Sequence, residues 1–174
     1  MAVDPYQQAW FNKTGLVNVE RAGFSEMVTH YQEPSFLALP RLVAEGRRFD
    51  FIFIDGGHRF EQILLDFLYA HRLLRPGCSM MLHDTWMPST RKALTFVLRN
   101  FGAHYRLDPN SLLPPYGMLR GALRALGMMW RSPGEPRVAL MLARKHLRNF
   151  VVLVKQGEVN EEGYDAAWDF YRSF

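Results

Sequence analysis

The sequence predicts an α/β fold, in which a mainly parallel sheet ends in an antiparallel edge. Residues 49–86 have the pattern of a strand, a helix and a second strand, which is the order of a parallel βαβ unit. Residues 27–46 show a strand and a helix before it. Near the end, the apolar runs 138–142 and 150–154 are separated by a connection short enough for an antiparallel hairpin. Alternating strands and helices followed by a hairpin indicate an α/β sheet with an antiparallel edge.

The composition is that of one ordinary globular domain. The chain has 174 residues, of which 48% are hydrophobic and 22% charged, so we expect a single domain over residues 1–174 with a real core. The formal net charge of +4 is small and the basic residues are scattered, which argues against nucleic-acid binding. The single cysteine, Cys78, excludes an internal disulfide and a CxxC metal site. We see no signal peptide and no apolar run of about 20 residues, so we expect no transmembrane segment and a cytoplasmic location.

The first 31 residues contain only short patterns of secondary structure. Ala2–Asp4 has the pattern of the last step of a strand that leads into a loop. We expect a helix over Gln7–Thr14, ended by Gly15, and a short connector over Leu16–Glu20. The apolar content of Met27–Tyr31 predicts the next strand.

A helix is predicted after this strand. Ser35 is a plausible N-cap, because its hydroxyl can accept a hydrogen bond from a free backbone N–H of the first turn. The apolar stripe continues to Val43, and Gly46 closes the helix. Pro40 lies inside the pattern and must begin or kink a turn there.

The central unit has the clearest pattern. The run Phe51–Ile54 is short, aromatic and β-branched, which predicts a strand buried on both faces. From Phe60 the apolar residues recur at three- and four-residue spacing, so a helix follows, and Arg75-Pro76-Gly77 stops it. The run Ser79–Leu82 predicts the second strand. A further helix begins near Pro88-Ser89 and carries one apolar face.

Residues 108–137 differ in composition from the rest of the chain, because Pro and Gly punctuate them throughout. We interpret this segment as an insert or lid within the domain. The basic, Met-rich stretch Met118–Arg131 is either an amphipathic helix that lies against a partner or a loop with a short packing helix, and the Gly content favours the loop.

Polar side chains follow both strands of the central unit. Asp55 and His58 come after the first strand, and His83 and Asp84 end the second. Ligands bind at the carboxyl ends of the strands in open α/β sheets, so we expect the functional site here. His58 is either a general base, because imidazole titrates near neutrality, or a cap of the helix that follows.

The chain resembles the class I S-adenosylmethionine-dependent methyltransferases, in particular the bacterial small-molecule and sugar O-methyltransferases related to the macrocin O-methyltransferase group. The resemblance implies a Rossmann-like sheet with helices on both faces and a C-terminal antiparallel hairpin. The segments that carry it lie between residues 2 and 94: AVDPY (2–6), GLVNVERAG (15–23), QEPSFLALPRL (32–42), FDFIFIDGGHRFEQILLDF (49–67), LLRPG (73–77) and LHDTWMPSTRKAL (82–94).

The resemblance also implies roles for individual residues. Asp4 matches the acid that binds the ribose hydroxyls of the cofactor, and Glu33 and Ser35 occupy the region that contacts the adenine, although Ser35 could equally be only a helix cap. Asp55 matches a residue beside the reacting methyl group, which is a base or a metal ligand in several relatives. Asp84 matches a second acidic position after the fifth strand of the family.

Metal-dependent relatives usually carry two acids after that strand, whereas the first of the pair here is His83. The resemblance therefore implies a divalent metal such as magnesium on Asp55, Asp84 and His83, but the imidazole weakens the case because Mg²⁺ prefers oxygen ligands.

The family's first strand and glycine-rich loop, which bind the methionine end of the cofactor, have no counterpart before Asp4, and GxGxxG is absent. We therefore expect the chain to be an N-terminally truncated, carboxyl-terminal part of such an enzyme. Its strands would then lack a neighbour, which favours self-association into a homo-oligomer.

Taken with the resemblance, the sequence predicts a transferase that uses S-adenosyl-L-methionine to methylate a hydroxyl of a small molecule or sugar. The alternative is a non-catalytic, methyltransferase-like binding or interaction module that cannot hold the cofactor alone. A nicotinamide-dependent oxidoreductase would need a glycine turn for the phosphates, which the chain does not show.

Overall fold

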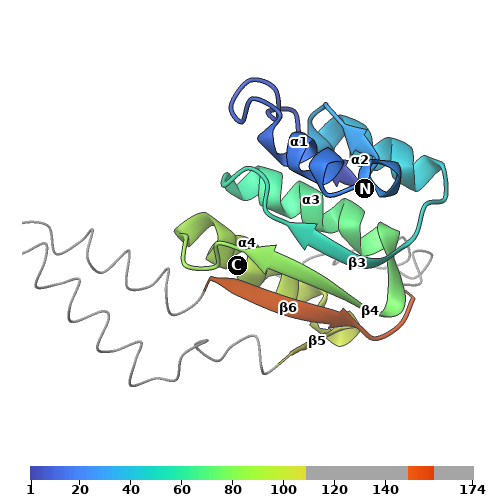
Figure 1. Cartoon of the computed structure of the whole chain (residues 1–174). Coiled ribbons are helices and arrows are strands. Elements are labelled where there is room, and N and C mark those ends of the chain that lie inside the picture. Colours follow the sequence, from blue (N-terminus) through green and yellow to red (C-terminus); the bar gives the residue numbers. More distant parts are fainter. Residues whose placement is uncertain (109–148, 159–174) are drawn as a thin grey trace, which may run out of the picture.

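The computed structural model describes residues 1–108 and 149–158 (Figure 1), which form a two-stranded parallel sheet and a mixed four-stranded sheet, flanked by helices. A small sheet pairs β1 with β2, and a four-stranded sheet has the order β3-β4-β6-β5. The elements, in chain order, are β1 (Ala2–Val3), α1 (Thr14–Arg21), η1 (Ser25–Met27), β2 (His30–Tyr31), α2 (Ser35–Ala44), β3 (Phe49–Ile54), α3 (Phe60–Leu73), β4 (Leu74–His83), α4 (Pro88–Asn100), η2 (Gly102–His104), β5 (Tyr105–Leu107) and β6 (Phe150–Lys155).

The predicted central βαβ unit is confirmed. Strands β3 and β4 pair in parallel, and α3 connects them. The register places Ile54 opposite Leu82, so the two strands end side by side. The segment Arg75–Gly77 was expected to end the helix and to separate it from the next strand. It does not, because β4 begins directly after α3. These residues form an irregularity within β4, where Gly77 has a positive φ of 76° that glycine adopts at low cost.

One face of the four-stranded sheet carries the core. Helices α3 and α4 lie on it, and Phe67 and Val97 from these helices are fully buried, as are Met80 and Leu153 from the strands. The alternation of side chains along a strand directs every second residue to the opposite face.

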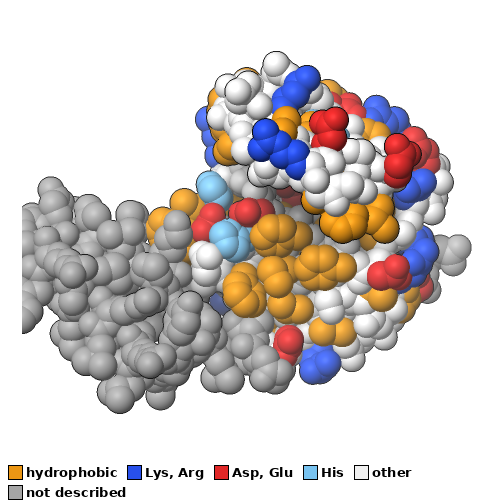
Figure 2. All heavy atoms as spheres, viewed as in Figure 1, with side chains coloured by type: hydrophobic (Ala, Val, Ile, Leu, Met, Phe, Trp, Pro, Cys, Tyr) orange, Lys and Arg blue, Asp and Glu red, His pale blue; other side chains and the backbone are white. Residues whose placement is uncertain are grey.

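The opposite face is uncovered in the part of the chain that the structure describes. Phe51 and Phe53 of β3 are 55% and 49% exposed, and apolar side chains form a continuous patch in this view (Figure 2). The expectation that this strand is buried on both faces is therefore wrong for residues 1–108 and 149–158. The reason is that no described helix packs over these two rings.

The antiparallel edge is built around β6. The predicted strand at 150–154 is confirmed, and it lies between β4 and β5 with antiparallel pairing on both sides. The three-residue strand β5 was not predicted. The other predicted hairpin strand, at 138–142, lies outside the described residues, as does the predicted insert or lid at 108–137 apart from Asp108.

The prediction for the first helix is wrong. Residues 5–13 form turns, and the helix α1 covers the segment that was expected to be a connector. Asn12 and Lys13 have positive φ values of 46° and 58°, so a right-handed helix cannot run through them. The helix begins immediately afterwards, with Gly15 as its second residue.

The strand predicted over 27–31 is confirmed only for its last two residues, because a 3₁₀ turn occupies the start of the segment. Helix α2 forms as expected, but Pro34 is its N-cap and Ser35 is already the first helical residue, with no side-chain capping bond. Pro40 lies inside the helix, which continues through it. Among the described residues, no helix has the length and apolar character needed to cross a membrane.

Candidate active site

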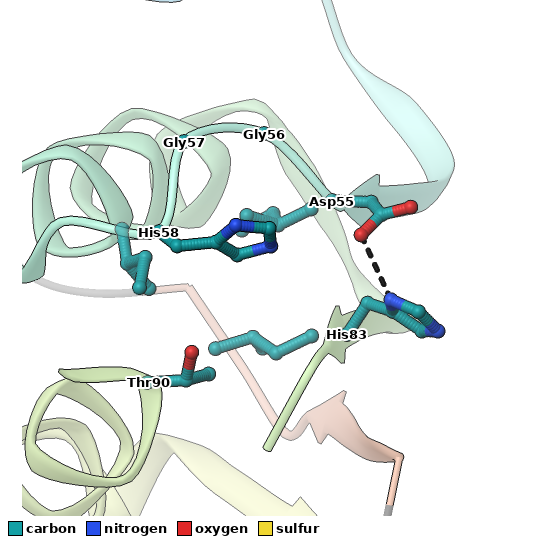
Figure 3. A pocket seen from close by; sticks show the side chains of 9 residues that line it. Asp55, Gly56, Gly57, His58, His83 and Thr90 are labelled. Carbon is teal, nitrogen blue, oxygen red and sulfur yellow. Dashed lines mark ion pairs between the residues drawn. The ribbon is translucent and has the colours of Figure 1, made fainter. Parts of the chain in front are cut away.

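Two acids and two histidines meet at the carboxyl ends of β3 and β4, as the sequence predicted. The pairing between them is crossed: Asp55, which follows β3, pairs with His83 at the end of β4. His58, from the loop after β3, pairs with Asp84, which follows β4. Each strand end therefore contributes one acid and one histidine, and each pair joins the two strands. Figure 3 shows Asp55 and His83 linked across the gap, with His58 on the loop above.

Asn149, which directly precedes β6, contacts the first pair. His83 Nδ1 lies 2.8 Å from Asp55 Oδ1, which is an ion-pair distance, although the N–H is not aligned for a hydrogen bond. On the other side of the ring, the amide Nδ2 of Asn149 lies 2.7 Å from His83 Nε2. Because an amide nitrogen only donates, Nε2 accepts and the neutral ring carries its proton on Nδ1, beside Asp55.

The second pair is joined by a hydrogen bond. The Nε2 of His58 lies 2.8 Å from Asp84 Oδ2, and the indole Nε1 of Trp86 donates to the other oxygen, Oδ1, at 2.8 Å. Asp84 has a positive φ of 51°, a conformation that Asp and Asn tolerate better than most residues. This backbone turn places the carboxylate between the two ring systems.

The surroundings favour the ionised form of Asp84. Burial alone would raise the pKa of this carboxyl group, but the hydrogen bond from Trp86, the electrostatic interaction with His83 and the hydrogen bond from His58 together lower it. An ionised carboxylate can only accept hydrogen bonds, so the Nε2 of His58 must be the donor. This donation identifies Nδ1 as the lone-pair nitrogen of the neutral His58 ring. The alternative role of His58 as a helix cap is not observed, because Arg59 is the N-cap of α3 and no side chain caps it.

A small pocket adjoins the two pairs. Its lining combines polar residues with apolar side chains of the core: Ile54, Asp55, Gly56, Gly57, His58, Ile63, Leu82, His83 and Thr90. Thr90 is 2% exposed, and its hydroxyl oxygen has no hydrogen-bond partner in the structure. A buried hydroxyl without a partner is costly, so this oxygen is available to a bound molecule.

The acids and His58 could also hold a cation. Ligand atoms of Asp55, His58 and Asp84 all lie within 4.8 Å of one another. Two carboxylates and one imidazole suit Mn²⁺ or Zn²⁺ at least as well as Mg²⁺. His83, predicted as a ligand, lies 3.5 Å from Asp84 Oδ2 through its Nδ1 atom and flanks this set.

Apart from Asp55, the residues predicted to bind the cofactor lie outside this cluster. Asp4 follows β1, and its carboxylate accepts hydrogen bonds from the backbone N–H of Tyr6 at 2.8 Å and from the side chain of Gln7 at 2.7 Å. Glu33 follows β2 and forms an ion pair with Arg41. Both acids therefore stand at carboxyl ends of the small parallel sheet, each with a local partner.

Ser35 is connected to the cluster through a buried acid. Its side chain hydrogen-bonds to Asp66, a residue of α3 that is 8% exposed. Burial raises the pKa of the Asp66 carboxyl group, and its Oδ1 atom has no partner. The other oxygen lies under Gly56, where an added Cβ would come within 3.2 Å of it. Asp66 thus lies beside the turn that carries His58.

Three residues of the site were not predicted. Trp86 lies two positions after Asp84. This short spacing between an indole and an acid is the sequence pattern from which its role could have been predicted. Thr90 belongs to the first turn of α4 and looks like an ordinary surface residue in the sequence. Asn149 is 66 residues away from His83 in the chain, so no local pattern could have identified it.

Comparisons with known proteins agree with this architecture. Residues 1–85 match the family model described as a methyltransferase domain. A solved structure, the O-methyltransferase TomG from Streptomyces achromogenes, involved in tomaymycin synthesis and in complex with SAM, has the same fold with a TM-score of 0.53 at 15% identity. The match covers 90% of this chain and 60% of that chain, so this chain spans well under the full length of TomG. The comparison with curated proteins returned no match.

The family match and the fold support the same class of protein. The methyltransferase model over residues 1–85, together with the sheet order and the parallel central unit, agrees with the resemblance to the class I S-adenosylmethionine-dependent methyltransferases. The narrower resemblance to the macrocin O-methyltransferase group stays a prediction.

Proposed function

We propose that this chain carries the acceptor side of the active site of an S-adenosylmethionine-dependent methyltransferase that acts on a hydroxyl of a small molecule or sugar. The observation that carries the proposal is the crossed pairing of Asp55 with His83 and of His58 with Asp84 at the carboxyl ends of two parallel strands. This edge is where α/β sheets bind ligands, and the chain has the fold of an O-methyltransferase.

The cofactor would supply an electrophilic methyl group on a sulfonium centre. We assign its binding to Asp4, Glu33, Ser35 and Asp55, which follow three parallel strands. A carboxylate accepts from two neighbouring hydroxyls, as a ribose would require of Asp4. Its present donors, Tyr6 N–H and the Gln7 amide, show that both carboxylate oxygens point to hydrogen-bonding partners.

The chain's own residues can activate the acceptor in two ways. Asp55 or His58 would take the hydroxyl proton, with the pocket orienting the acceptor for in-line attack. Alternatively, Asp55 and Asp84, with a histidine beside them, would hold a divalent cation such as Mg²⁺ that lowers the pKa of the hydroxyl. The spacing of the ligand atoms, within 4.8 Å, fits a cation as well as a proton relay.

A second function has one observation in its favour. A non-catalytic module that docks a partner through its sheet would expose apolar side chains, as Phe51 and Phe53 do. The retained Asp–His pairs favour the enzyme, because an interaction module has no need of them.

Titration of S-adenosylhomocysteine into the 174-residue chain, measured by calorimetry and with folding checked by circular dichroism, distinguishes the two functions. Micromolar binding would support the methyltransferase, and an assay with hydroxyl-bearing acceptors should follow. A folded chain that does not bind would instead support the interaction module. We further propose a cytoplasmic location, a small-molecule substrate and a homo-oligomer formed through the uncovered sheet.

A further inference from the structure

We infer that the pocket beside the two Asp–His pairs binds a single hydroxyl group, and that the Oγ1 atom of Thr90 is the hydrogen-bonding partner of that group. The hydroxyl group comes from one of two sources, a water molecule or the methyl acceptor. The inference rests on the proposed methyltransferase function and deepens it, because it makes Thr90 a residue that distinguishes between acceptors.

The unpaired hydroxyl of Thr90 gives the first reason. The residue is 2% exposed, and its Oγ1 atom has no hydrogen-bond partner among the described residues. A threonine in a helix can bond the carbonyl oxygen four residues earlier, as Thr95 of the same helix does with Arg91 at 2.8 Å. Thr90 is only the third residue of α4, so the carbonyl group four residues before it lies outside the helix. Its hydroxyl can therefore both donate to and accept from a ligand.

The size of the pocket gives the second reason. It encloses about 10 Å³ that is open to the centre of a water-sized molecule. This is close to the space that one water needs, so a single hydroxyl group fits and a larger group does not. A methyl group of similar size would leave the Thr90 hydroxyl unpaired, which is costly at a buried position.

The lining gives the third reason, because it changes from buried to exposed along the pocket. Ile63, Leu82 and Thr90 are 5%, 1% and 2% exposed, and they form the closed end. The side chains of Asp55 and His58 are 41% and 48% exposed, and they form the open end. Figure 3 shows the hydroxyl of Thr90 directed toward the space beneath the loop that carries His58. A ligand group that enters beside the Asp–His pairs would therefore end at Thr90.

The glycine turn adds further hydrogen-bonding groups. Gly56 and Gly57 line the pocket, and a glycine presents only backbone groups to its surroundings. A buried water needs roughly two to four polar partners. The Thr90 hydroxyl and the backbone of this turn provide them.

The consequence for the acceptor is selection by hydrogen bonding. A ligand group that displaces an ordered water loses affinity unless it reproduces the hydrogen bond of that water. An acceptor with a hydroxyl group at this position reproduces it. An acceptor with a hydrogen or a methyl group there leaves Thr90 unpaired, so the site discriminates against it.

The test measures NMR cross-relaxation between water and the methyl groups that line the pocket, in the 174-residue chain with isotope-labelled methyl groups. We expect a bound-water contact with a methyl group of Ile54, Ile63 or Leu82. Glycerol is then added as a hydroxyl-bearing probe. Contacts from glycerol to the same methyl groups, with loss of the water contact, would show that the hydroxyl of an acceptor can reach Thr90. A water contact that persists in glycerol would assign the site to water.

Thr90→Val is the decisive variant, since valine keeps the shape of the side chain and removes only the hydroxyl. We expect the water contact to be lost and the melting temperature to fall by roughly 2–4 °C, as the loss of one hydrogen bond produces in a chain of this size. Thr90→Ser retains the hydroxyl and should retain the contact. Thr95→Val, at an exposed position of the same helix, is the matched control and should leave the contact unchanged.

Three outcomes overturn the inference. The first is that neither water nor glycerol contacts the pocket methyl groups in wild type. The second is an equal contact in wild type and in Thr90→Val. The third is a melting temperature that rises in Thr90→Val, as expected when a buried hydroxyl without any partner is removed.

Each sample is also titrated with S-adenosylhomocysteine, so that the two proposals can fail separately. A wild-type chain that shows the contact but does not bind S-adenosylhomocysteine would contradict the proposed function alone. Binding of S-adenosylhomocysteine without the contact would contradict the inference alone.

Discussion

Lys155 fastens the last described strand to the end of the crossover helix through the backbone of His71. Its side chain is 1% exposed, and its Nζ donates to the carbonyl oxygen of His71 at 3.0 Å and to that of Leu74 at 2.8 Å. Glu158 lies 3.2 Å from the same nitrogen and balances the charge. A cation at a helix C-terminus is favourable, because the free carbonyl groups there carry partial negative charge.

Replacing this lysine should destabilise the fold. Lys155→Met keeps the length of the side chain but leaves two buried carbonyl groups without their donor, so we expect the free energy of unfolding to fall by about 2–4 kcal/mol. Urea denaturation followed by circular dichroism measures the change. Lys92→Met is the matched control, because Lys92 is exposed on α4. Equal effects of the two substitutions would contradict a structural role for Lys155.

His71 should make stability depend on pH. Burial, followed by the nearby charge of Lys155, lowers the pKa of His71 from 6.5 to about 4 in the folded protein. Between these values the unfolded chain binds the proton more readily, so stability is complete above about pH 6.5 and falls as the pH drops towards 4. A shift of this size corresponds to roughly 3 kcal/mol.

The measurement compares urea unfolding at several pH values between 7 and about 4 in wild type and in His71→Gln. Gln does not titrate, so the part of the pH dependence that is due to His71 should disappear. Tyr105, whose hydroxyl lies 2.8 Å from His71 Nδ1, retains a polar partner in this variant. An unchanged pH dependence in His71→Gln would show that His71 ionises equally in the folded and unfolded states.

Asp55 should be essential for turnover. Asp55→Asn removes the negative charge that faces His83. The same carboxylate is the candidate base or metal ligand, so we expect the rate of methyl transfer to fall by at least about 100-fold. The assay follows formation of S-adenosylhomocysteine with a panel of hydroxyl-bearing acceptors. Asp50→Asn, which removes an exposed acid paired with Arg75, serves as the control. Unchanged turnover in Asp55→Asn would remove Asp55 from the mechanism.

The uncovered face of the sheet should cause self-association. Replacing Phe51 and Phe53 by Lys adds charge to side chains that are half exposed, so the fraction of oligomer should fall. The free energy of unfolding should change by less than about 1 kcal/mol. Sedimentation velocity measures the oligomer, and Trp10→Lys, at a residue that is 70% exposed outside the sheet, is the control. A wild-type chain that is monomeric at high concentration would contradict this prediction.

The periodic parts of the fold could be predicted from the sequence. The stripe from Phe60 and the helix after Pro88 are confirmed, because a long repeat at helical spacing specifies one buried face. The strand at 150–154 was equally clear. The first helix was misplaced, since left-handed residues at Asn12 and Lys13, which no local pattern revealed, decide where it begins.

The candidate site was only half predictable. The sequence identified Asp55, His58, His83 and Asp84 as neighbours, because the ends of adjacent parallel strands meet. It did not show which acid pairs with which histidine, since that depends on the register of two strands and on the turn at Asp84. The contribution of Asn149 depends on how β6 docks beside β4, which is a long-range contact.

Both crossed pairs depend on the register between β3 and β4. Asp55 meets His83 only because Ile54 stands opposite Leu82, and the same alignment brings His58 to Asp84. A slip of one residue between β3 and β4 would turn every side chain of the moved strand to the other face and break both pairs at once. The chemistry of the site is thus coupled to correct strand assembly: a misaligned sheet would be inactive from the outset, without passing through a partly active form.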